Sequence, residues 1–285
     1  MVHLIVPQPL SNVAEARVAA LGLESRLICY PDLTQEVALG AGTYLFTSAS
    51  ALSAPQRALA IVAEEALGAG GPGFRLMNRP SLVPGRRLLM DAFEAEGFPV
   101  VERRAASAMP ASVKYPLVLR WESAHGIAES PVLSDEAELR EAVGTMVLGG
   151  FALADQYGLH MPALDTLLER SPAAWALKIG DAAVMSSSLE SGKPGELAKS
   201  FLSSKALSSV DFVMLSFLLA DGRPVLWRID DSPTALPDQA SCPPAAWPRI
   251  RDKVHAAFQA LDAGSGDGEA FIRFTRESVR AALKA

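Results

Sequence analysis

The stretch VDFVMLSFLLADGRPVLWRIDDSP, residues 210–233, decides the fold because it contains the strongest hairpin signal in the chain. Two apolar runs with strand character, Val210–Leu219 and Pro224–Ile229, flank the dipeptide Asp221-Gly222. This dipeptide is typical of a two-residue β-turn between neighbouring strands. The sequence therefore predicts an antiparallel hairpin here.

A two-residue turn also fixes which residues of the hairpin face each other. It places Val213 opposite Asp230 and puts three charged residues, Asp211, Arg228 and Asp230, on one face. Buried charges are costly unless they are paired or coordinated. Three interpretations stay open: a structural salt-bridge network, a solvated face, or an active-site face where the two carboxylates hold Mg²⁺, which prefers oxygen ligands.

Upstream of the hairpin, strands and helices alternate over residues 1–80. Four short segments have strand character: Leu4–Val6, Arg26–Tyr30, Thr43–Phe46 and Phe74–Met77. Helices are expected at Asn12–Leu21 and after a capping box formed by Ser53 and Gln56. This alternation predicts an N-terminal α/β unit with a small, mostly parallel sheet.

The rest of the chain predicts two further units. Residues 81–111 contain a helix, Arg86–Glu96, and a linker of small residues. A strand, a loop and a helix make a small central unit at 112–149: Tyr115–Trp121, residues 122–126, and a helix from Ser134 or Asp135 to about Val143. Residues 150–285 form a C-terminal unit with more strands and a helical tail. Its strands are expected at Phe151–Ala154, Trp175–Ile179, Ala182–Ser186 and in the hairpin. A helix is expected at Trp247–Leu261, and after a glycine break, Gly264–Gly268, a last helix that runs to Leu283.

Composition limits the class of protein. The chain has 285 residues, of which 49% are hydrophobic and 20% charged, so it has enough apolar residues for a buried core. The net charge of −6 disfavours nucleic acid or an anionic membrane as a partner. The longest apolar run, Phe212–Ala220, is too short to cross a bilayer, and two cysteines are too few for a disulfide framework. We expect a soluble, cytoplasmic protein.

Basic residues are the other candidate site groups. Arg86 and Arg87 begin a predicted helix, Arg120 ends a strand, and Lys178 lies inside one. Each alone is a weak signal that gains weight only if the fold brings the residues to one cleft. The planar guanidinium of arginine matches phosphate oxygens well. No GxGxxG, GxxxxGK[ST] or GxSxG motif is present, and the four histidines show no metal-binding spacing.

The order of the segments resembles the ATP-grasp superfamily, especially the glutathione-synthetase and RimK-like ligases. The resemblance rests on Asn78-Arg79-Pro80, the strand YPLVLR (115–120), the helix SDEAELREAV (134–143) and the stretch 210–233. It covers most of residues 74–233, and the order carries it, because no single motif is highly specific. It implies an ATP-grasp-like α/β fold that binds ATP and magnesium between the central and C-terminal units.

The resemblance also implies roles for particular residues. Arg86 and Arg120 would contact the phosphates, with the loop 122–126 as a flexible lid. Asp155 and Gln156 would lie at the hinge that meets adenine and ribose. Lys178 would lie near the γ-phosphate or the carboxylate substrate and act in catalysis with Arg228. Asp211 and Asp230 would bind the metal.

The implied activity is a ligase reaction. ATP would phosphorylate a carboxylate of a small molecule or peptide, and an amine would attack the acyl phosphate. Two departures from the family pattern support an alternative: Arg228 stands in place of a metal-binding glutamate, and Asp230 in place of an asparagine. The alternative is a degenerate ATP-grasp-like protein that acts as a binding or regulatory partner, with a homodimer as one arrangement.

Overall fold

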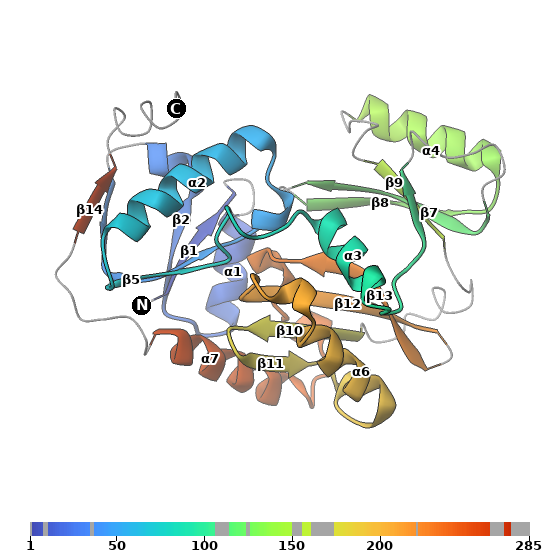
Figure 1. The fold of residues 1–285 in the computed structure, drawn as a ribbon. Coiled ribbons are helices and arrows are strands. Elements are labelled where there is room, and N and C mark those ends of the chain that lie inside the picture. Colours follow the sequence, from blue (N-terminus) through green and yellow to red (C-terminus); the bar gives the residue numbers. More distant parts are fainter. Residues whose placement is uncertain are drawn as a thin grey trace.

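The computed structural model describes residues 2–7, 11–34, 37–105, 114–123, 126–149, 156–160, 174–220, 222–262 and 271–274. Three four-stranded sheets and one two-stranded sheet contain the strands. Figure 1 shows the three larger sheets in different parts of the molecule, with helices packed around and between them.

The N-terminal sheet is parallel, as the sequence predicts. Its order is β2-β1-β4-β5, and its strands have the following bounds: Val2–Val6 (β1), Ser25–Cys29 (β2), Gly42–Phe46 (β4) and Phe74–Met77 (β5). Helix α1 spans Ser11–Ala20 and α2 spans Ala54–Ala69, which begins with the predicted capping box of Ser53 and Gln56. Strand β1 has β2 on one side and β4 on the other. The chain therefore adds its later strands on the opposite side of β1 from β2, and the strand order reverses at β1.

The C-terminal sheet is antiparallel and contains the predicted hairpin. Its order is β11-β10-β12-β13, with these bounds: Ala174–Ile179 (β10), Ala182–Met185 (β11), Phe212–Ala220 (β12) and Arg223–Asp230 (β13). Ala220 pairs with Arg223, as a two-residue turn requires. Further from the turn, Phe217 pairs with Leu226 but Ser216 pairs with Arg228, so Trp227 is an extra residue in β13. This β-bulge shifts the register by one residue.

Helices cover both faces of the C-terminal sheet. Helix α3 (Arg86–Ala95) and helix α6 (Gly192–Leu202) pack through Phe93 and Phe201 against Val213 and Leu215. Helix α7 (Trp247–Asp262) packs through Phe258 against Phe212 and other side chains of the opposite face, and also contacts the N-terminal sheet. The core therefore joins the two sheets into one body (Figure 1).

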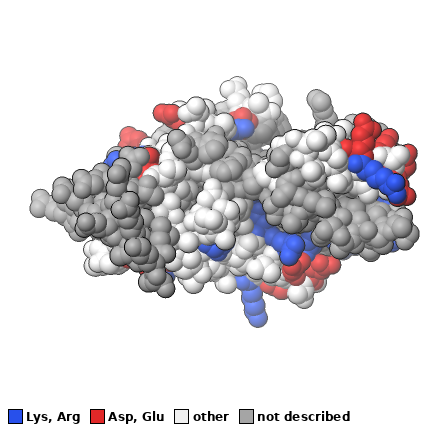
Figure 2. Space-filling model, turned by 90° about the horizontal axis from the view of Figure 1, so that it is seen from above, with Lys and Arg blue, Asp and Glu red and all other residues white. Residues whose placement is uncertain are grey.

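The third sheet, of order β6-β9-β7-β8, belongs to the central part of the chain. Its strands and helix have these bounds: Arg103–Ala105 (β6), Leu117–Ser123 (β7), Gly126–Leu133 (β8), Gln156–His160 (β9) and Glu136–Leu148 (α4). Asp135 caps α4, because its side chain accepts a hydrogen bond from the Glu138 N–H. In the view from above, acidic and basic side chains lie together over this helix (Figure 2).

Two predictions about elements are wrong in the described residues. The expected loop 122–126 is largely strand, because Glu122 pairs with Ile127 and Ser123 with Gly126 in a tight hairpin. The expected last helix is a strand where it is described, since Phe271–Phe274 (β14) pairs with Val37–Gly40 (β3). The predicted strand Phe151–Ala154 lies outside the described residues.

Among the described residues, no helix is both long enough and apolar enough to cross a bilayer.

Candidate functional site

The register shift in β13 separates the charged residues that the sequence places together. Arg228 lies opposite Ser216 and Asp230 opposite Met214, so these two charges share a face of the sheet. Val213 and Leu215 point to the other face, into the core with α3 and α6. The prediction that Asp211, Arg228 and Asp230 lie on one face among Val213 and Leu215 is therefore wrong, because the bulge at Trp227 reverses the facing of the residues beyond it.

Asp230 lies at the end of β13 and is held by two arginines. Its Oδ1 is 3.1 Å from Nη2 of Arg86, the first residue of α3. Its Oδ2 is 2.8 Å from Nη2 of Arg228, and Oδ1 also accepts a hydrogen bond from the Ser232 N–H at 2.9 Å. Asp230 is only 2% exposed. Both carboxylate oxygens are thus already occupied by protein donors.

Asp231, the next residue, connects the hairpin to the N-terminal unit. Its carboxylate accepts hydrogen bonds from the backbone N–H of Ser50 at 2.9 Å and from the Ser50 hydroxyl at 2.6 Å. Its backbone oxygen accepts from the Ser48 N–H at 3.0 Å. Arg86 lies 3.7 Å from the carboxylate. Burial raises the pKa of Asp231, while Arg86 and Ser50 partly offset that effect.

Together Arg86, Arg228, Asp230 and Asp231 form what we call the charge cluster. Two guanidinium groups face two carboxylates, so its formal charge is zero. It lies beside Ser48 and Ser50, which follow the carboxyl end of β4, next to the point where the order of the parallel strands reverses. In open α/β sheets this edge is where ligands bind. Ser48 adopts a left-handed conformation with φ of 55° and its side chain is fully buried.

The sequence predicts Arg86, Arg228 and Asp230 as site residues but misses Asp231 and Ser50. Asp231 follows a predicted strand and resembles a loop residue. Its partners at Ser48 and Ser50 lie far away in the sequence, so no local pattern identifies the contact.

Lys178 and Asp211 form a separate group. Lys178 pairs with Val213 across the sheet, and its Nζ donates to the carbonyl oxygens of Leu207 (2.9 Å) and Val210 (2.7 Å). Desolvation lowers the pKa of Lys178, although Asp211 and Asp181 act in the opposite direction. These contacts satisfy the ammonium group within the protein, and its predicted role at a γ-phosphate stays a prediction.

Asp211 is bound to Asn78, which follows β5. The Asp211 carboxylate accepts a hydrogen bond from the Asn78 N–H at 3.0 Å, and the Asn78 side-chain oxygen accepts from the N–H of Asp211 and of Phe212. Asn78 Nδ2 donates to the Phe212 carbonyl at 2.7 Å. Asn78 has a left-handed φ of 49°, which asparagine tolerates better than most residues. This arrangement ties the two sheets together.

Arg120 links the central sheet to the bulge. Its Nη1 donates to the Trp227 carbonyl at 2.8 Å, and its guanidinium carbon lies 4.3 Å from the centre of a Trp227 ring. Arg120 is 2% exposed. Two of the cations predicted to contact phosphates, Arg86 and Arg120, are therefore both buried against protein groups.

Two predicted nucleotide-binding residues remain outside this description. Asp155 lies outside the described residues, and Gln156 is described only by its backbone, which pairs with Trp121 at the start of β9. Their roles at adenine and ribose stay predictions.

The donor set does not fit a magnesium ion shared by Asp211 and Asp230. Asp211 is bound to Asn78, and both oxygens of Asp230 are bound to guanidinium groups. In the part of the chain that the structure describes, no three His, Cys, Asp or Glu side chains gather where they could hold a metal ion. A divalent cation beside Arg86 and Arg228 would be repelled by both.

Comparisons with known proteins identify the architecture. No protein family and no curated protein matches the sequence. The structure is similar to a RimK domain ATP-grasp protein from Sphaerobacter thermophilus, with 14% identity, a TM-score of 0.55 and coverage of 92% of this chain and 100% of that one. It is also similar to D-alanine–D-alanine ligase from Bacillus anthracis complexed with ATP, with 11% identity, a TM-score of 0.54 and coverage of 100% and 98%. The chain therefore has the ATP-grasp fold.

Proposed function

Starting from the ATP-grasp fold, we propose that this chain is a degenerate member of that architecture, which serves as a binding or regulatory protein without magnesium-dependent ligase activity. The observation that carries the proposal is the occupation of both Asp230 oxygens by Arg86 and Arg228. In this account fixed guanidinium groups provide the positive charge that a metal ion would otherwise supply.

Electrostatics favours keeping this arrangement. The charge cluster is neutral as it stands, and three of its members, Arg86, Asp230 and Asp231, are less than 10% exposed. A magnesium ion could reach Asp230 only if a guanidinium group left it. Displacing Arg86, whose side chain is 6% exposed, would leave a buried guanidinium without this carboxylate partner, at a cost of about 3–5 kcal/mol, whereas Arg228, at 35% exposed, would cost less to displace.

The alternative is the ligase activity itself. The fold favours it, because the similar structures include D-alanine–D-alanine ligase and N5-carboxyaminoimidazole synthetase from Staphylococcus aureus, the latter at 10% identity with a TM-score of 0.52, covering 96% of this chain and 79% of that one. In this hypothesis the chain would bind ATP and a carboxylate of a small molecule or peptide. Arg228 would neutralise phosphate charge directly.

Thermal unfolding with and without nucleotide separates the two hypotheses. A ligand that binds only the native state stabilises it by about 2.7 kcal/mol at a hundredfold excess over Kd, so a ligase should show a higher thermal midpoint in millimolar ATP with Mg²⁺. The degenerate protein should show no magnesium-dependent shift and no release of phosphate from ATP with mixed carboxylates and amines.

A matched variant checks that the assay can detect binding. The double substitution Arg228→Glu and Asp230→Asn restores the residue types of the family pattern. We expect a magnesium-dependent ATP shift to appear in this variant only. A shift of equal size in the wild-type chain would overturn the proposal and support the ligase.

A further inference from the structure

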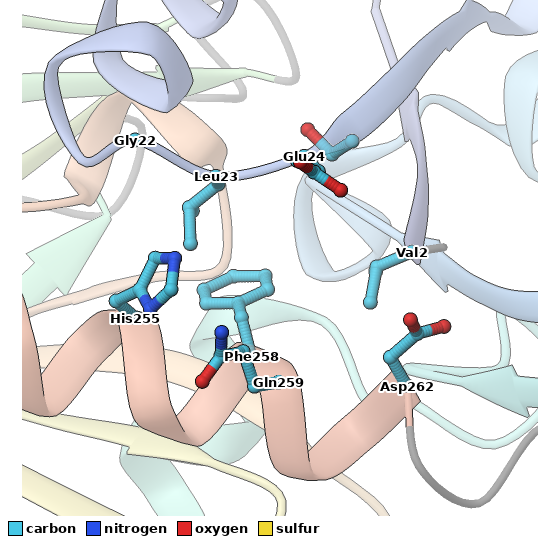
Figure 3. A pocket seen from close by; sticks show the side chains of 9 residues that line it. Val2, Gly22, Leu23, Glu24, His255, Phe258, Gln259 and Asp262 are labelled. Carbon is cyan, nitrogen blue, oxygen red and sulfur yellow. The ribbon is translucent and has the colours of Figure 1, made fainter.

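The N-terminal and C-terminal sheets are fastened to each other by an apolar core. Helix α7 packs against both, and its Phe258, which is 4% exposed, lies in one cluster with Val2 of β1 and Leu177 of β10. Figure 3 shows Val2 and Leu23 beside Phe258, where they line a cavity of about 350 Å³. Separating these two sheets would expose the apolar surface of the cluster to water, at about 25 cal/mol for each Å².

The central sheet is attached to the rest of the molecule differently. Its own apolar cluster includes Leu117 and Leu119 of β7 and Leu139 and Met146 of α4, the helix that covers one face of this sheet (Figure 1). In the described part of the chain, no apolar cluster contains side chains from a strand of the central sheet and from another sheet. Any attachment through the other face must therefore use other kinds of contact.

Strand pairing places two arginines on that other face. Val118 and Arg120 alternate along β7 with the two leucines that pack under α4, so they face away from the helix. Arg103 of β6 is level with Val118, because both residues pair with Leu159 of β9. Arg103 and Arg120 therefore lie on the same face of the central sheet.

Arg103 joins this face to helix α3. Its guanidinium forms ion pairs with Asp91 and with Glu94, and its Nη1 lies 3.4 Å from Oε2 of Glu94. The two acids are three positions apart in the helix, so they share a face of α3. The Arg103 side chain is 12% exposed, whereas those of Asp91 and Glu94 are 54% and 68% exposed. The contact is ionic, and water and dissolved ions reach its acidic side.

We propose that Arg103 is a salt-sensitive latch that holds the central sheet closed against α3, and that the latch opens while the sheets stay folded. Arg120 makes the second attachment, through Trp227, but Arg120 is 2% exposed. Salt screens exposed charges strongly and buried ones much less. Opening therefore depends on ionic strength chiefly through Arg103. The proposal is independent of the proposed function, because it applies to a ligase and to a degenerate protein alike.

Labelling of an introduced cysteine measures opening even when the open form is rare. Val118 is 5% exposed on the face that opening uncovers, so N-ethylmaleimide should react with Val118→Cys only in the open form. Leu119→Cys is the matched site, because Leu119 lies under α4 and becomes accessible only when the central sheet unfolds. The background carries Cys29→Ser and Cys242→Ala, which removes the native thiols. Each rate is divided by that of the urea-unfolded chain.

Substitution of Arg103 should accelerate the labelling of Val118→Cys alone. We expect Arg103→Gln to raise this rate about three- to tenfold, the scale of ion pairs with exposed acids, and Arg103→Glu to raise it further. Adding Asp91→Arg to Arg103→Glu restores an ion pair with reversed charges and should slow the labelling at least about threefold. Arg140→Gln, which breaks the exposed pair with Glu136 on α4, is the matched control and should leave both rates unchanged.

The salt dependence gives an independent measurement. Raising NaCl from about 0.05 M to about 1 M should accelerate the labelling of Val118→Cys about threefold with Arg103 present, and by less than about half that factor in Arg103→Gln. An unchanged rate in Arg103→Gln, equal acceleration at Leu119→Cys, no compensation by Asp91→Arg, or the same salt dependence without Arg103 would each overturn the proposal.

Discussion

Arg86 and Asp230 form a buried ion pair between the first residue of α3 and the last residue of β13, with Nη2 and Oδ1 3.1 Å apart and side-chain exposures of 6% and 3%. The pair joins segments separated by 144 positions in the sequence. It anchors the charge cluster at the edge of the N-terminal sheet. The following predictions test this cluster and the contacts around it.

Removing Arg86 should destabilise the protein strongly. Arg86→Met leaves Asp230 and Asp231 buried beside each other with Arg228 as the remaining cation, and we expect a loss of about 3–5 kcal/mol in the free energy of unfolding. Arg87→Met is the matched control, because Arg87 is exposed on the same turn of α3. Urea unfolding measures both, and equal effects of the two substitutions would show that the ion pair contributes little.

The contact between Arg120 and Trp227 should stabilise the attachment of the central sheet. Arg120→Met removes a cation–π contact and leaves the Trp227 carbonyl without this donor, at an expected cost of about 1–3 kcal/mol. Arg140→Met on α4 is the control, since its pair with Glu136 is exposed and should be worth less than about 1 kcal/mol. A double-mutant cycle with Trp227→Leu, which removes the aromatic ring, gives the coupling of the cation–π contact, and additive effects would refute that contact.

Asp211 should stabilise the fold through its hydrogen bonds with Asn78 instead of binding a metal ion. Asp211→Asn keeps an oxygen that can accept the Asn78 N–H, so we expect a change in stability within about 1 kcal/mol. Asn78→Gly keeps the left-handed backbone but removes the side-chain bonds to Asp211 and Phe212, at an expected cost of about 2–4 kcal/mol. If Asp211→Asn proved the more damaging of the two, the structural role would be wrong.

His3 should make the stability depend on pH. It stacks on Tyr44 with ring centres 4.5 Å apart, and burial, with help from Arg26, lowers its pKa from 6.5 to about 4. Between pH 6.5 and 4 the unfolded chain therefore binds a proton at His3 that the folded protein does not bind. The contribution of His3 to the free energy of unfolding is fully present above pH 6.5 and decreases as the pH falls towards 4. The slope from this one group is at most about 1.4 kcal/mol per pH unit.

His3→Phe keeps an aromatic ring and removes the titration. Unfolding by urea at several pH values should give a shallower loss of stability between pH 6.5 and 4 than in the wild-type chain. The raised pKa of Asp231 acts in the opposite direction, but it is present in both proteins and cancels in the difference. Parallel curves for the two proteins would contradict the assignment to His3.

Local patterns were sufficient for much of the fold. Short-range signals predict the hairpin, the capping box of α2 and a helix at Trp247–Leu261. The structure confirms them, with Ala220 paired to Arg223 and the helix at Trp247–Asp262. The strand β8 was missed because it contains Pro131 and polar residues, which are tolerated at the edge of a sheet. Strand β14 was missed because its partner β3 lies more than two hundred residues away.

The site was harder to predict because it depends on register. The turn fixes the pairing of Ala220 with Arg223, but the bulge at Trp227 is stabilised by distant groups: Arg120 on its carbonyl and the Pro99 oxygen on the Leu226 N–H. Neither contact is visible in the hairpin sequence. The extra residue places Arg228 and Asp230 on the opposite face of the sheet from Val213. The predicted single cluster is therefore split into the charge cluster and the separate group of Lys178 and Asp211.

Titration of Mn²⁺ followed by electron paramagnetic resonance tests the central claim most directly, because manganese takes the same oxygen ligands as magnesium and its free ion gives a strong signal. Because ATP itself binds Mn²⁺, each signal is compared with a protein-free sample that contains the same amount of ATP, and we expect the wild-type chain to leave the free-ion signal unchanged from that reference. The variant carrying Arg228→Glu and Asp230→Asn should reduce the free-ion signal further than the same amount of ATP does without protein. Stoichiometric binding of Mn²⁺ by the wild-type chain, lost on Asp230→Asn, would contradict the claim that arginines take the place of the metal.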